Sequence, residues 1–227
     1  MASGLNIQSK RFPEGSQGPN PKTCLLVFGI ALVVFLLIAA AVVNAGGLTL
    51  LDARINVGLH SNTRPGLIEF FIWVSKLHSN WSTTIVTGAI AVYLWIKRLH
   101  YWILILAISV WGGVLLNVIL KLLFARPRAH FDNPILTLPT FSFPSGHTML
   151  ATVFYGSLCV FTFRRTRSQP VRGLVMLLTV LMIALVGFSR MYLGVHYLTD
   201  VLGAIAEGVA WISFSLLLVT TLRRQRN

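Results

Sequence analysis

The sequence predicts an all-α integral membrane protein, a bundle of six transmembrane helices, and its composition and block pattern carry that prediction. Of 227 residues, 55% are hydrophobic and only 11% are charged, whereas about 25% of the residues in a soluble domain are charged. The apolar residues form long blocks separated by short basic segments. Residues 24–43 are an uncharged run of 20 residues, which at about 1.5 Å per residue crosses a hydrocarbon core of about 30 Å.

Five further apolar blocks are long enough to span the membrane once a few flanking residues are added. The segment 67–74 is apolar too, but it is bounded by charged residues and too short to cross. It predicts a short interfacial or re-entrant helix in the first outer loop, with Phe70, Phe71 and Trp73 near the lipid headgroups. A buried core helix is the alternative for this segment. The five blocks are residues 81–96, 101–120, 147–163, 173–189 and 201–222.

Residues 1–22 are predicted to be a flexible cytoplasmic leader, followed by a membrane domain over residues 23–227. The leader is polar and rich in Pro, Gly and Ser, a composition that cannot bury a core. A cleaved signal peptide is the alternative, with residues 43–45 as a small-residue cleavage site. The long leader and the apolar run of 20 residues disfavour it, because signal peptides carry about 7–15 apolar residues.

The charge is strongly basic, with 19 Lys and Arg against 6 Asp and Glu and a net charge of +13. These residues lie between apolar blocks and form no single patch, which excludes a water-soluble nucleic-acid binder. Twelve of the 19 lie in the tails and alternate connections, so the positive-inside rule places both termini in the cytoplasm. In a bacterial inner (cytoplasmic) membrane the other loops then face the periplasm or the cell exterior. The twelve are Lys10, Arg11, Lys22, Lys97, Arg98, Arg164, Arg165, Arg167, Arg172, Arg223, Arg224 and Arg226.

The cysteine content excludes one class of protein, and the lack of a repeat counts against another. Cys24 and Cys159 both lie in apolar runs, and two such residues build neither a disulfide framework nor a multi-cysteine metal site. The chain shows no convincing internal repeat, which gives no support to a transporter of two inverted halves. The sequence predicts no particular oligomeric state.

Three polar clusters fall on the predicted outer face: residues 121–128, 143–147 and 189–200. The third cluster joins spans five and six. If the sixth span begins near Gly194, His196 and Asp200 lie four residues apart on one helix face. Asp200 would then accept the Nδ1 proton of His196 and leave Nε2 free as a nucleophile. A structural pair of satisfied polar groups at a helix start is the alternative, and it is favoured when the pair is taken alone.

The second cluster opens the fourth span. Ser145 follows Pro144 and is a natural N-cap, and Gly146 allows a ligand to approach the backbone closely. Open N–H groups at such a helix start bind anions. His147 would donate a proton to a leaving oxygen. The alternative is a helix cap with no further role.

The first cluster supplies cations where the third span ends. Lys121 and Arg128, with Arg190 from the third cluster, face the same outer loops, and guanidinium groups bind phosphate oxygens in pairs. The alternative is that these cations extend to the membrane surface without binding phosphate. For Arg126 this alternative is as well supported as a role in the site. Three cations, two imidazoles, a carboxylate and a helix start together predict a phosphoryl site.

In these motifs the sequence resembles the type-2 phosphatidic acid phosphatase superfamily. Its signature is Lys-x6-Arg-Pro, Pro-Ser-Gly-His and Ser-Arg-x5-His-x3-Asp. The second and third blocks match in full, at residues 144–147 and 189–200, and the first reads Lys121-x6-Arg128-Ala129. Ala129 replaces the usual proline, which bears on the stiffness of the loop more than on the phosphate contact, since Pro127 lies beside Arg128.

The resemblance implies a phosphohydrolase that needs no metal or other cofactor. By this resemblance His196 attacks phosphorus, Asp200 orients it, and His147 protonates the leaving group before water cleaves the phosphohistidine. The groups implied to hold the phosphoryl oxygens are Lys121, Arg128, Arg190, Ser145 and the N–H of Gly146.

Vanadate-dependent haloperoxidases, which are soluble, are similar in the same motifs. Six spans favour a lipid phosphate substrate in the membrane: phosphatidic acid, phosphatidylglycerol phosphate, undecaprenyl pyrophosphate or lipid A phosphate. A phosphotransferase using the same site and, less favoured, a lipid or anion transporter are the alternatives. The loop 125–143 either shapes the entrance or serves only packing.

Two polar positions within the predicted spans yield a further hypothesis. On an ideal helix Glu207 lies within about 20° of the azimuth of His196, and Asn117 lies one turn before Lys121. A carboxyl group within a span is costly and is usually functional or paired. We therefore expect Glu207 to lie beneath the pocket, hydrogen-bonded to Asn117. A Glu near a water-filled crevice with no dedicated partner is the alternative.

Overall fold

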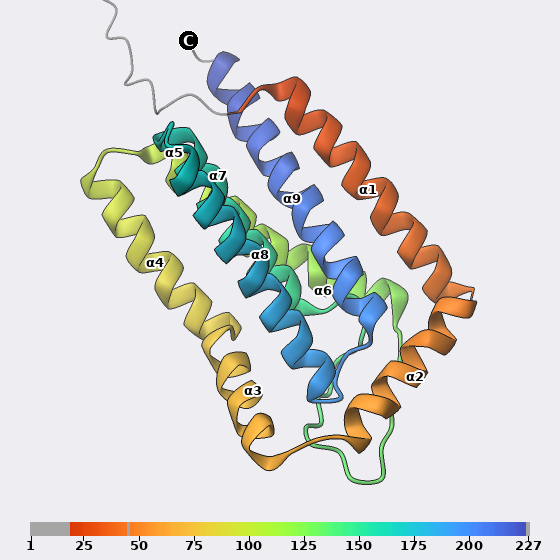
Figure 1. Cartoon of the computed structure of the whole chain (residues 1–227). Coiled ribbons are helices and arrows are strands. Elements are labelled where there is room, and N and C mark those ends of the chain that lie inside the picture. Colours follow the sequence, from red (N-terminus) through yellow and green to blue (C-terminus); the bar gives the residue numbers. More distant parts are fainter. Residues whose placement is uncertain (1–18, 45, 226–227) are drawn as a thin grey trace, which may run out of the picture.

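The computed structural model describes residues 19–44 and 46–225, which form helices and no strand (Figure 1). The expected leader therefore lies mostly outside the described residues, and its last two residues already belong to the first helix. In chain order the helices are α1 (Pro21–Val43), α2 (Gly47–Ser61), α3 (Pro65–Leu77), α4 (Asn80–Ile96), α5 (His100–Ala107), the π-helical turn η2 (Ile108–Gly112), α6 (Gly113–Phe124), α7 (Gly146–Arg165), α8 (Gln169–Tyr192) and α9 (Leu198–Gln225).

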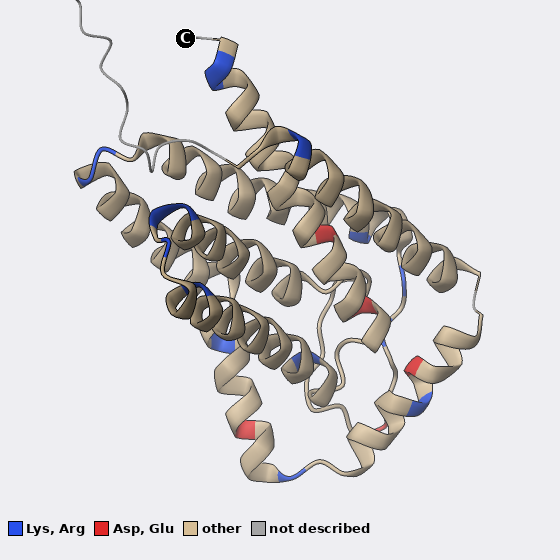
Figure 2. Ribbon diagram, turned by 45° about the horizontal axis from the view of Figure 1, so that its top comes forward, with Lys and Arg blue, Asp and Glu red and all other residues tan. Residues whose placement is uncertain are grey.

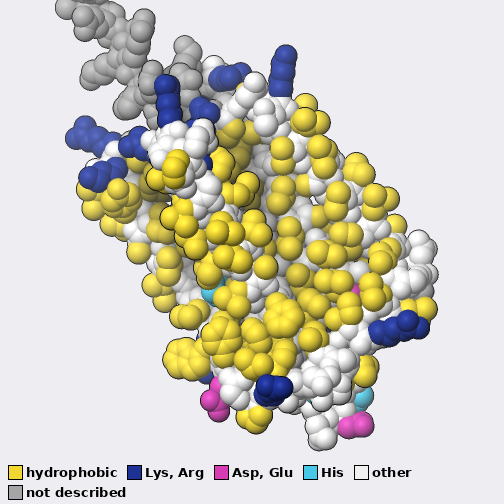
Figure 3. Space-filling view, viewed as in Figure 1, with side chains coloured by type: hydrophobic (Ala, Val, Ile, Leu, Met, Phe, Trp, Pro, Cys, Tyr) yellow, Lys and Arg dark blue, Asp and Glu magenta, His cyan; other side chains and the backbone are white. Residues whose placement is uncertain are grey.

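Within the described residues, five helices are long and apolar enough to cross a membrane: α1, the continuous His100–Phe124, α7, α8 and α9. Hydrophobic side chains cover the flank of the bundle seen in Figure 3, as a helix in lipid requires. The basic positions lie mostly at helix ends and in connections (Figure 2). The structure thus contains the expected helical bundle with five clear spans.

The remaining expected span, residues 81–96 and the second along the chain, corresponds to α4, which has 17 residues and is shorter than the five clear spans. Only two residues separate it from α3, and the two helices follow one another along the same side of the bundle (Figure 1). The α3 segment expected to be interfacial buries Phe71 but leaves Trp73 66% exposed. The count of six spans and the interfacial placement both stay predictions.

Helix boundaries follow local chemistry. Asn20 caps α1 by accepting from the N–H of Lys22 at 3.0 Å, with Pro21 in the first helical position. Ser79 caps α4 through the N–H of Ser82. The helix α2 was not marked by any apolar block, because polar residues such as Asp52 interrupt it.

The predicted third span is a single helical rod interrupted by the π turn η2. Trp211 of α9 donates from Nε1 to the carbonyl of Ile108 at 3.0 Å, at the start of this turn. Gly112 and Gly113 leave room for the indole ring, since a Cβ on Gly112 would lie 2.6 Å from it. The π turn and the two glycines thus seat α9 against the α5–α6 rod.

Small residues let α9 approach the other central helices closely. Gly208 faces Thr152 of α7, and Gly203 faces the ring of Phe143, which is fully buried and stacks on Phe35 of α1. Close backbone approach of this kind drives helix association where lipid removes the hydrophobic effect. The packing brings the ends of α6 and α8 and the starts of α7 and α9 to the end of the bundle occupied by α2 and α3 (Figure 1).

Gly208→Ala is expected to destabilise the bundle, because the added Cβ would lie 2.7 Å from side-chain atoms of Thr152. Overpacking costs about 1–3 kcal/mol, so the thermal unfolding midpoint in detergent should fall by several degrees. The matched control is Gly173→Ala in α8, where nothing lies within 4 Å of the added carbon. Equal midpoints for the two variants would contradict the close packing of α7 and α9.

Candidate active site

The three polar clusters of the sequence meet in one place. The N–H of Ser145 donates to the carbonyl of Asp200 at 3.1 Å, which joins the second cluster to the third. An atom added at the Cβ position of Gly146 would lie 3.8 Å from the Lys121 side chain, which joins the second to the first. A terminal nitrogen of Arg128 lies 3.4 Å from Nε2 of His196, which joins the first cluster to the third.

His196 lies just before α9 and contacts Asp200, which lies in the first turn of that helix. Because α9 begins at Leu198, the expectation that both residues share one helix face is wrong, yet Nδ1 of His196 lies 3.3 Å from Oδ2 of Asp200. His196 is 3% exposed. Burial lowers its pKa to about 3, an effect that Asp200 opposes and Arg128 reinforces. The imidazole is therefore neutral at pH 7, with a free Nε2 once Nδ1 carries the proton shared with Asp200.

The carboxylate of Asp200 has no exposed surface and is bound on both oxygens. Oδ2 accepts from the hydroxyl of Ser142 and from the N–H of Tyr197 at 2.9 Å, in addition to His196. The bond from Tyr197 is half of a capping box, in which an acidic residue at the third helical position reaches back to the helix start. Oδ1 accepts from Arg126 at 2.6 Å.

Arg126 joins two buried carboxylates, and the alternative that it snorkels to the membrane surface is wrong. Its guanidinium lies 2.6 Å from Asp200 and 2.8 Å from Asp52, and it covers the ring of Tyr197 at 4.3 Å. Burial by itself would lower the pKa of Arg126, but Asp200 and Asp52 outweigh burial and raise it. Asp52 was missed because it lies on α2, outside every motif; a lone acidic residue in an outer segment was the only signal.

The cations of the first cluster converge on the same loop. Arg128 donates from Nε to the carbonyl of Thr140 at 2.7 Å, from a terminal nitrogen to that of Phe141 at 3.0 Å, and to the carbonyl of Val195. Lys121 donates to the carbonyl of Phe141 at 2.7 Å. Burial lowers the pKa of Arg128, and Asp200 partly offsets this. The side chains of Lys121 and Arg128 therefore donate to neutral backbone carbonyls. A charged phosphate oxygen would be a stronger acceptor for these donors than the carbonyls are.

Arg190 of α8 is 3% exposed and donates to the hydroxyl of Ser75 on α3. Its Nε has no hydrogen-bond partner among the described residues. A buried guanidinium with a spare donor has the chemistry to bind an anion. Ser75 is a contact that no motif indicated.

The start of α7 places the remaining two groups. Ser145 occupies the N-cap position, but its hydroxyl contacts Thr148 Oγ1 at 3.0 Å and makes no capping bond to the backbone, unlike the expectation. His147 lies in the first turn and interacts electrostatically with Arg190, His196 and Lys121. Among the described residues, no group of three or more His, Cys, Asp or Glu side chains is arranged to hold a metal ion.

The pairing expected between Glu207 and Asn117 is present. Asn117 donates to Oε2 of Glu207 at 3.0 Å, and both side chains are 3% exposed. A Cβ at Gly146 would lie 3.2 Å from Oδ1 of Asn117, so the pair lies directly against the start of α7. The second oxygen of Glu207, Oε1, has no partner among the described residues.

The fold and this cluster define a helical membrane protein with a cation-lined site around a buried histidine. The PAP2 superfamily model matches residues 100–224. Phosphatidylglycerophosphatase B of Bacillus subtilis (strain 168) is 30% identical over 182 residues, or 79% of this chain and 89% of that protein.

Two solved structures are similar to the chain. The crystal structure of the first transmembrane PAP2 type phosphatidylglycerolphosphate phosphatase, from Bacillus subtilis, gives a TM-score of 0.71 at 26% identity, over 91% of this chain and 97% of the other. Aquifex aeolicus LpxE gives 0.57 at 24% identity, over 73% and 94%, a likeness of fold.

The chain belongs to the PAP2 superfamily, which confirms the resemblance carried by its three motifs. It is a membrane lipid phosphatase of that superfamily. The matched region, residues 100–224, includes all three motifs but neither α2 nor α3.

Asn117→Leu is expected to lower the stability by about 1–3 kcal/mol, because Glu207 would lose its donor in a buried site. The measurement is thermal unfolding of the purified protein in detergent. Glu207→Gln is the matched control: it keeps an acceptor for Asn117 and should lose less. A wild-type midpoint for Asn117→Leu would show that the hydrogen bond carries no stability.

Proposed function

We propose that this chain removes a phosphoryl group from a lipid phosphate or pyrophosphate through a phosphohistidine formed on His196. The observation that carries the proposal is the neutral, buried imidazole of His196, oriented by Asp200 and bordered by Arg128 at its free nitrogen. The similarity to phosphatidylglycerophosphatase B favours phosphatidylglycerol phosphate among the four candidate lipids.

In the first step the phosphoryl oxygens bind Lys121, Arg128 and Arg190, displacing the loop carbonyls from the first two. Nε2 of His196 then attacks phosphorus in line, the phosphorus–nitrogen bond forms, and the bond to the lipid oxygen breaks. His147 gives its proton to that oxygen, so that a lipid monophosphate leaves as the lipid alcohol and a lipid pyrophosphate leaves as the lipid monophosphate. Asp200 stabilises the positive charge that develops on the imidazole.

In the second step water attacks the phosphorus of phosphohistidine. His147, now neutral, accepts a proton from the water, the phosphorus–nitrogen bond breaks, and inorganic phosphate leaves. The three cations meet the charge that spreads over the phosphoryl oxygens in both transition states. Fixed positive side chains thus stabilise the charge that a metal ion would otherwise stabilise. We therefore expect turnover in the presence of EDTA.

The proposed topology has both termini and the leader in the cytoplasm, six crossings, and the site at the outer face of a bacterial inner membrane. Figure 3 supports it: Lys and Arg gather at the end of the bundle where the C-terminus lies, opposite to α2 and α3. In the second crossing along the chain, α3 and α4 together run from the site end to the basic end. The short α4 then needs no full span of its own.

A phosphotransferase remains the second candidate, because the same phosphohistidine would react with a lipid alcohol in place of water. Product analysis with paired lipids separates the two: release of inorganic phosphate supports the hydrolase, and transfer of label to the second lipid supports the phosphotransferase. A transporter would move the lipid phosphate without releasing phosphate.

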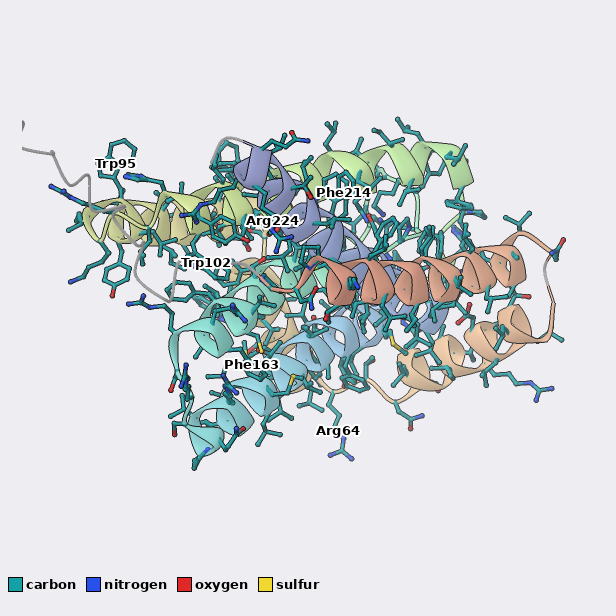
Figure 4. All side chains as sticks on the ribbon, turned by 90° about the horizontal axis from the view of Figure 1, so that it is seen from above. Arg64, Trp95, Trp102, Phe163, Phe214 and Arg224 are labelled. Carbon is teal, nitrogen blue, oxygen red and sulfur yellow. The ribbon has the colours of Figure 1, made fainter. Side chains whose placement is uncertain are left out.

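His196→Ala is expected to lower phosphate release from dioctanoyl phosphatidic acid in EDTA by at least about a thousandfold, because the nucleophile is lost. The control is Arg64→Ala, since the Arg64 side chain extends away from the bundle (Figure 4). Phosphate release by a folded His196→Ala protein at the wild-type rate would rule out the proposed nucleophile.

The topology predicts opposite labelling of two cysteine variants by a membrane-impermeant maleimide. Asp132→Cys, in the loop before α7, should react in intact cells, and Arg167→Cys, between α7 and α8, only after the membrane is permeabilised. Both positions are exposed, whereas the natural Cys24 and Cys159 are buried and should give little background. The reverse pattern would invert the orientation.

A further inference from the structure

We infer that Asp52 is a positioning residue of this site and that α2 is therefore part of the catalytic apparatus. The inference rests on the proposed function, because it assigns Asp52 a part in orienting the His196–Asp200 pair. It extends the site beyond the three motifs, to a helix that the family model does not match.

The carboxylate of Asp52 is 1% exposed and is fully engaged at the start of α9. Oδ1 accepts from the backbone N–H of Thr199 at 3.0 Å, and Oδ2 accepts from the hydroxyl of the same residue and from Arg126 at 2.8 Å. One of the open N–H groups of the first turn of α9 is thus capped by a side chain from another helix. Asp52 fixes both the helix that carries Asp200 and the guanidinium that binds it.

These contacts form a continuous chain of charges that ends at the nucleophile. Asp52 binds Arg126, Arg126 binds Asp200, and Asp200 lies against Nδ1 of His196. With two carboxylates to share, Arg126 neutralises only part of Asp200. Asp200 thus keeps negative charge for the imidazole, which becomes positive as phosphohistidine forms.

A second contact holds α2 against the site. His60, two turns beyond Asp52, stacks on Phe131 with ring centroids 3.9 Å apart and an angle of 13° between the planes. Phe131 and Arg126 both belong to the loop between α6 and α7, so α2 contacts this loop at two points. The same ring lies 3.2 Å from the Cβ position of Gly194, whose φ of +72° suits glycine at the turn before His196.

Other charged groups face the pair from several elements. His196 interacts with Asp200 of α9, with Arg128 of the loop before α7 and with Lys121 of α6, and His147 of α7 interacts with His196 in turn. Three more residues belong to the surroundings: Arg190 of α8 and His78, which follows α3, interact with His147, and Tyr197 interacts with Asp52 and Arg126. All of these stay unchanged when only Asp52 and Arg126 are varied.

The test is the steady-state hydrolysis of dioctanoyl phosphatidic acid in detergent across a pH series. Asp52→Asn should lower kcat about tenfold to a hundredfold, as loss of a group that orients a histidine does at metal sites. Its KM should stay nearly unchanged, because Asp52 lies behind Asp200 and away from Lys121 and Arg128. The matched control is Glu69→Gln, which removes one exposed carboxylate from α3 and should keep wild-type values.

Arg126→Gln provides the readout that a packing role would not move. His196 attacks only when neutral, so the acid limb of kcat/KM reports its pKa. Removing the nearby positive charge raises that pKa and moves the limb to higher pH, by about one unit. In the double variant Asp52→Asn and Arg126→Gln one charge of each sign is lost, so the limb should return toward wild type. Because the substrate titrates identically for every variant, a difference in the acid limb between variants comes from the protein.

The outcomes separate the inference from the proposed function. If the wild type releases no phosphate from any lipid phosphate tried, the proposed function fails. If the wild type is active and Asp52→Asn matches it, or if the limb moves equally in Arg126→Gln and the double variant, Asp52 has no positioning role. Should Asp52→Asn alone not fold, the double variant decides: a limb that returns toward wild type supports the inference, and a limb that stays where Arg126→Gln puts it overturns the inference.

Discussion

A carboxylate without exposed surface at the start of α9 is the constraint on which the rest of the site depends. Asp200 can stay ionised there only because Arg126, Ser142, Tyr197 and His196 all donate to it or share a proton with it. Removing one partner of a buried ion pair costs about 3–5 kcal/mol. The positions of the loop before α7, of the turn before α9 and of α2 all follow from satisfying this one group.

The membrane imposes the second condition. A spanning helix satisfies its backbone internally, so open donors and acceptors are available only at helix ends. The ends of α6 and α8 and the starts of α7 and α9 all lie at one end of the bundle, where each presents a motif residue. Close packing at Gly203 and Gly208 fixes how α9 sits among these helices. The site is thus built from helix termini that tight packing holds in register.

Much of this arrangement could be predicted from residue patterns. The apolar blocks located the long helices to within a few residues, because hydropathy in a spanning helix is set by lipid and not by neighbours. Helical periodicity was enough to pair Glu207 with Asn117, since both lie within regular helices. The start of α9 was placed too early. The N–H of Tyr197 donates to Asp200 in a capping box, so the helix begins at Leu198, two residues after His196.

What could not be predicted depends on contacts between distant segments. The bridge from Arg126 to Asp52 joins residues 74 apart in the sequence, and neither a period nor a motif marks Asp52. The contact of Arg190 with Ser75 is of the same kind. The π turn near Trp211 was hidden for another reason: an uninterrupted apolar run looks the same whether its helix is regular or widened.

The most direct test of the central claim is a crystal structure of the protein with vanadate, which takes the place of a phosphoryl group. The account predicts vanadium bonded to Nε2 of His196, with its oxygens within hydrogen-bond distance of Lys121, Arg128 and Arg190. Vanadate bound elsewhere, or held by the cations with His196 turned away from it, would contradict a single phosphoryl site built around this histidine.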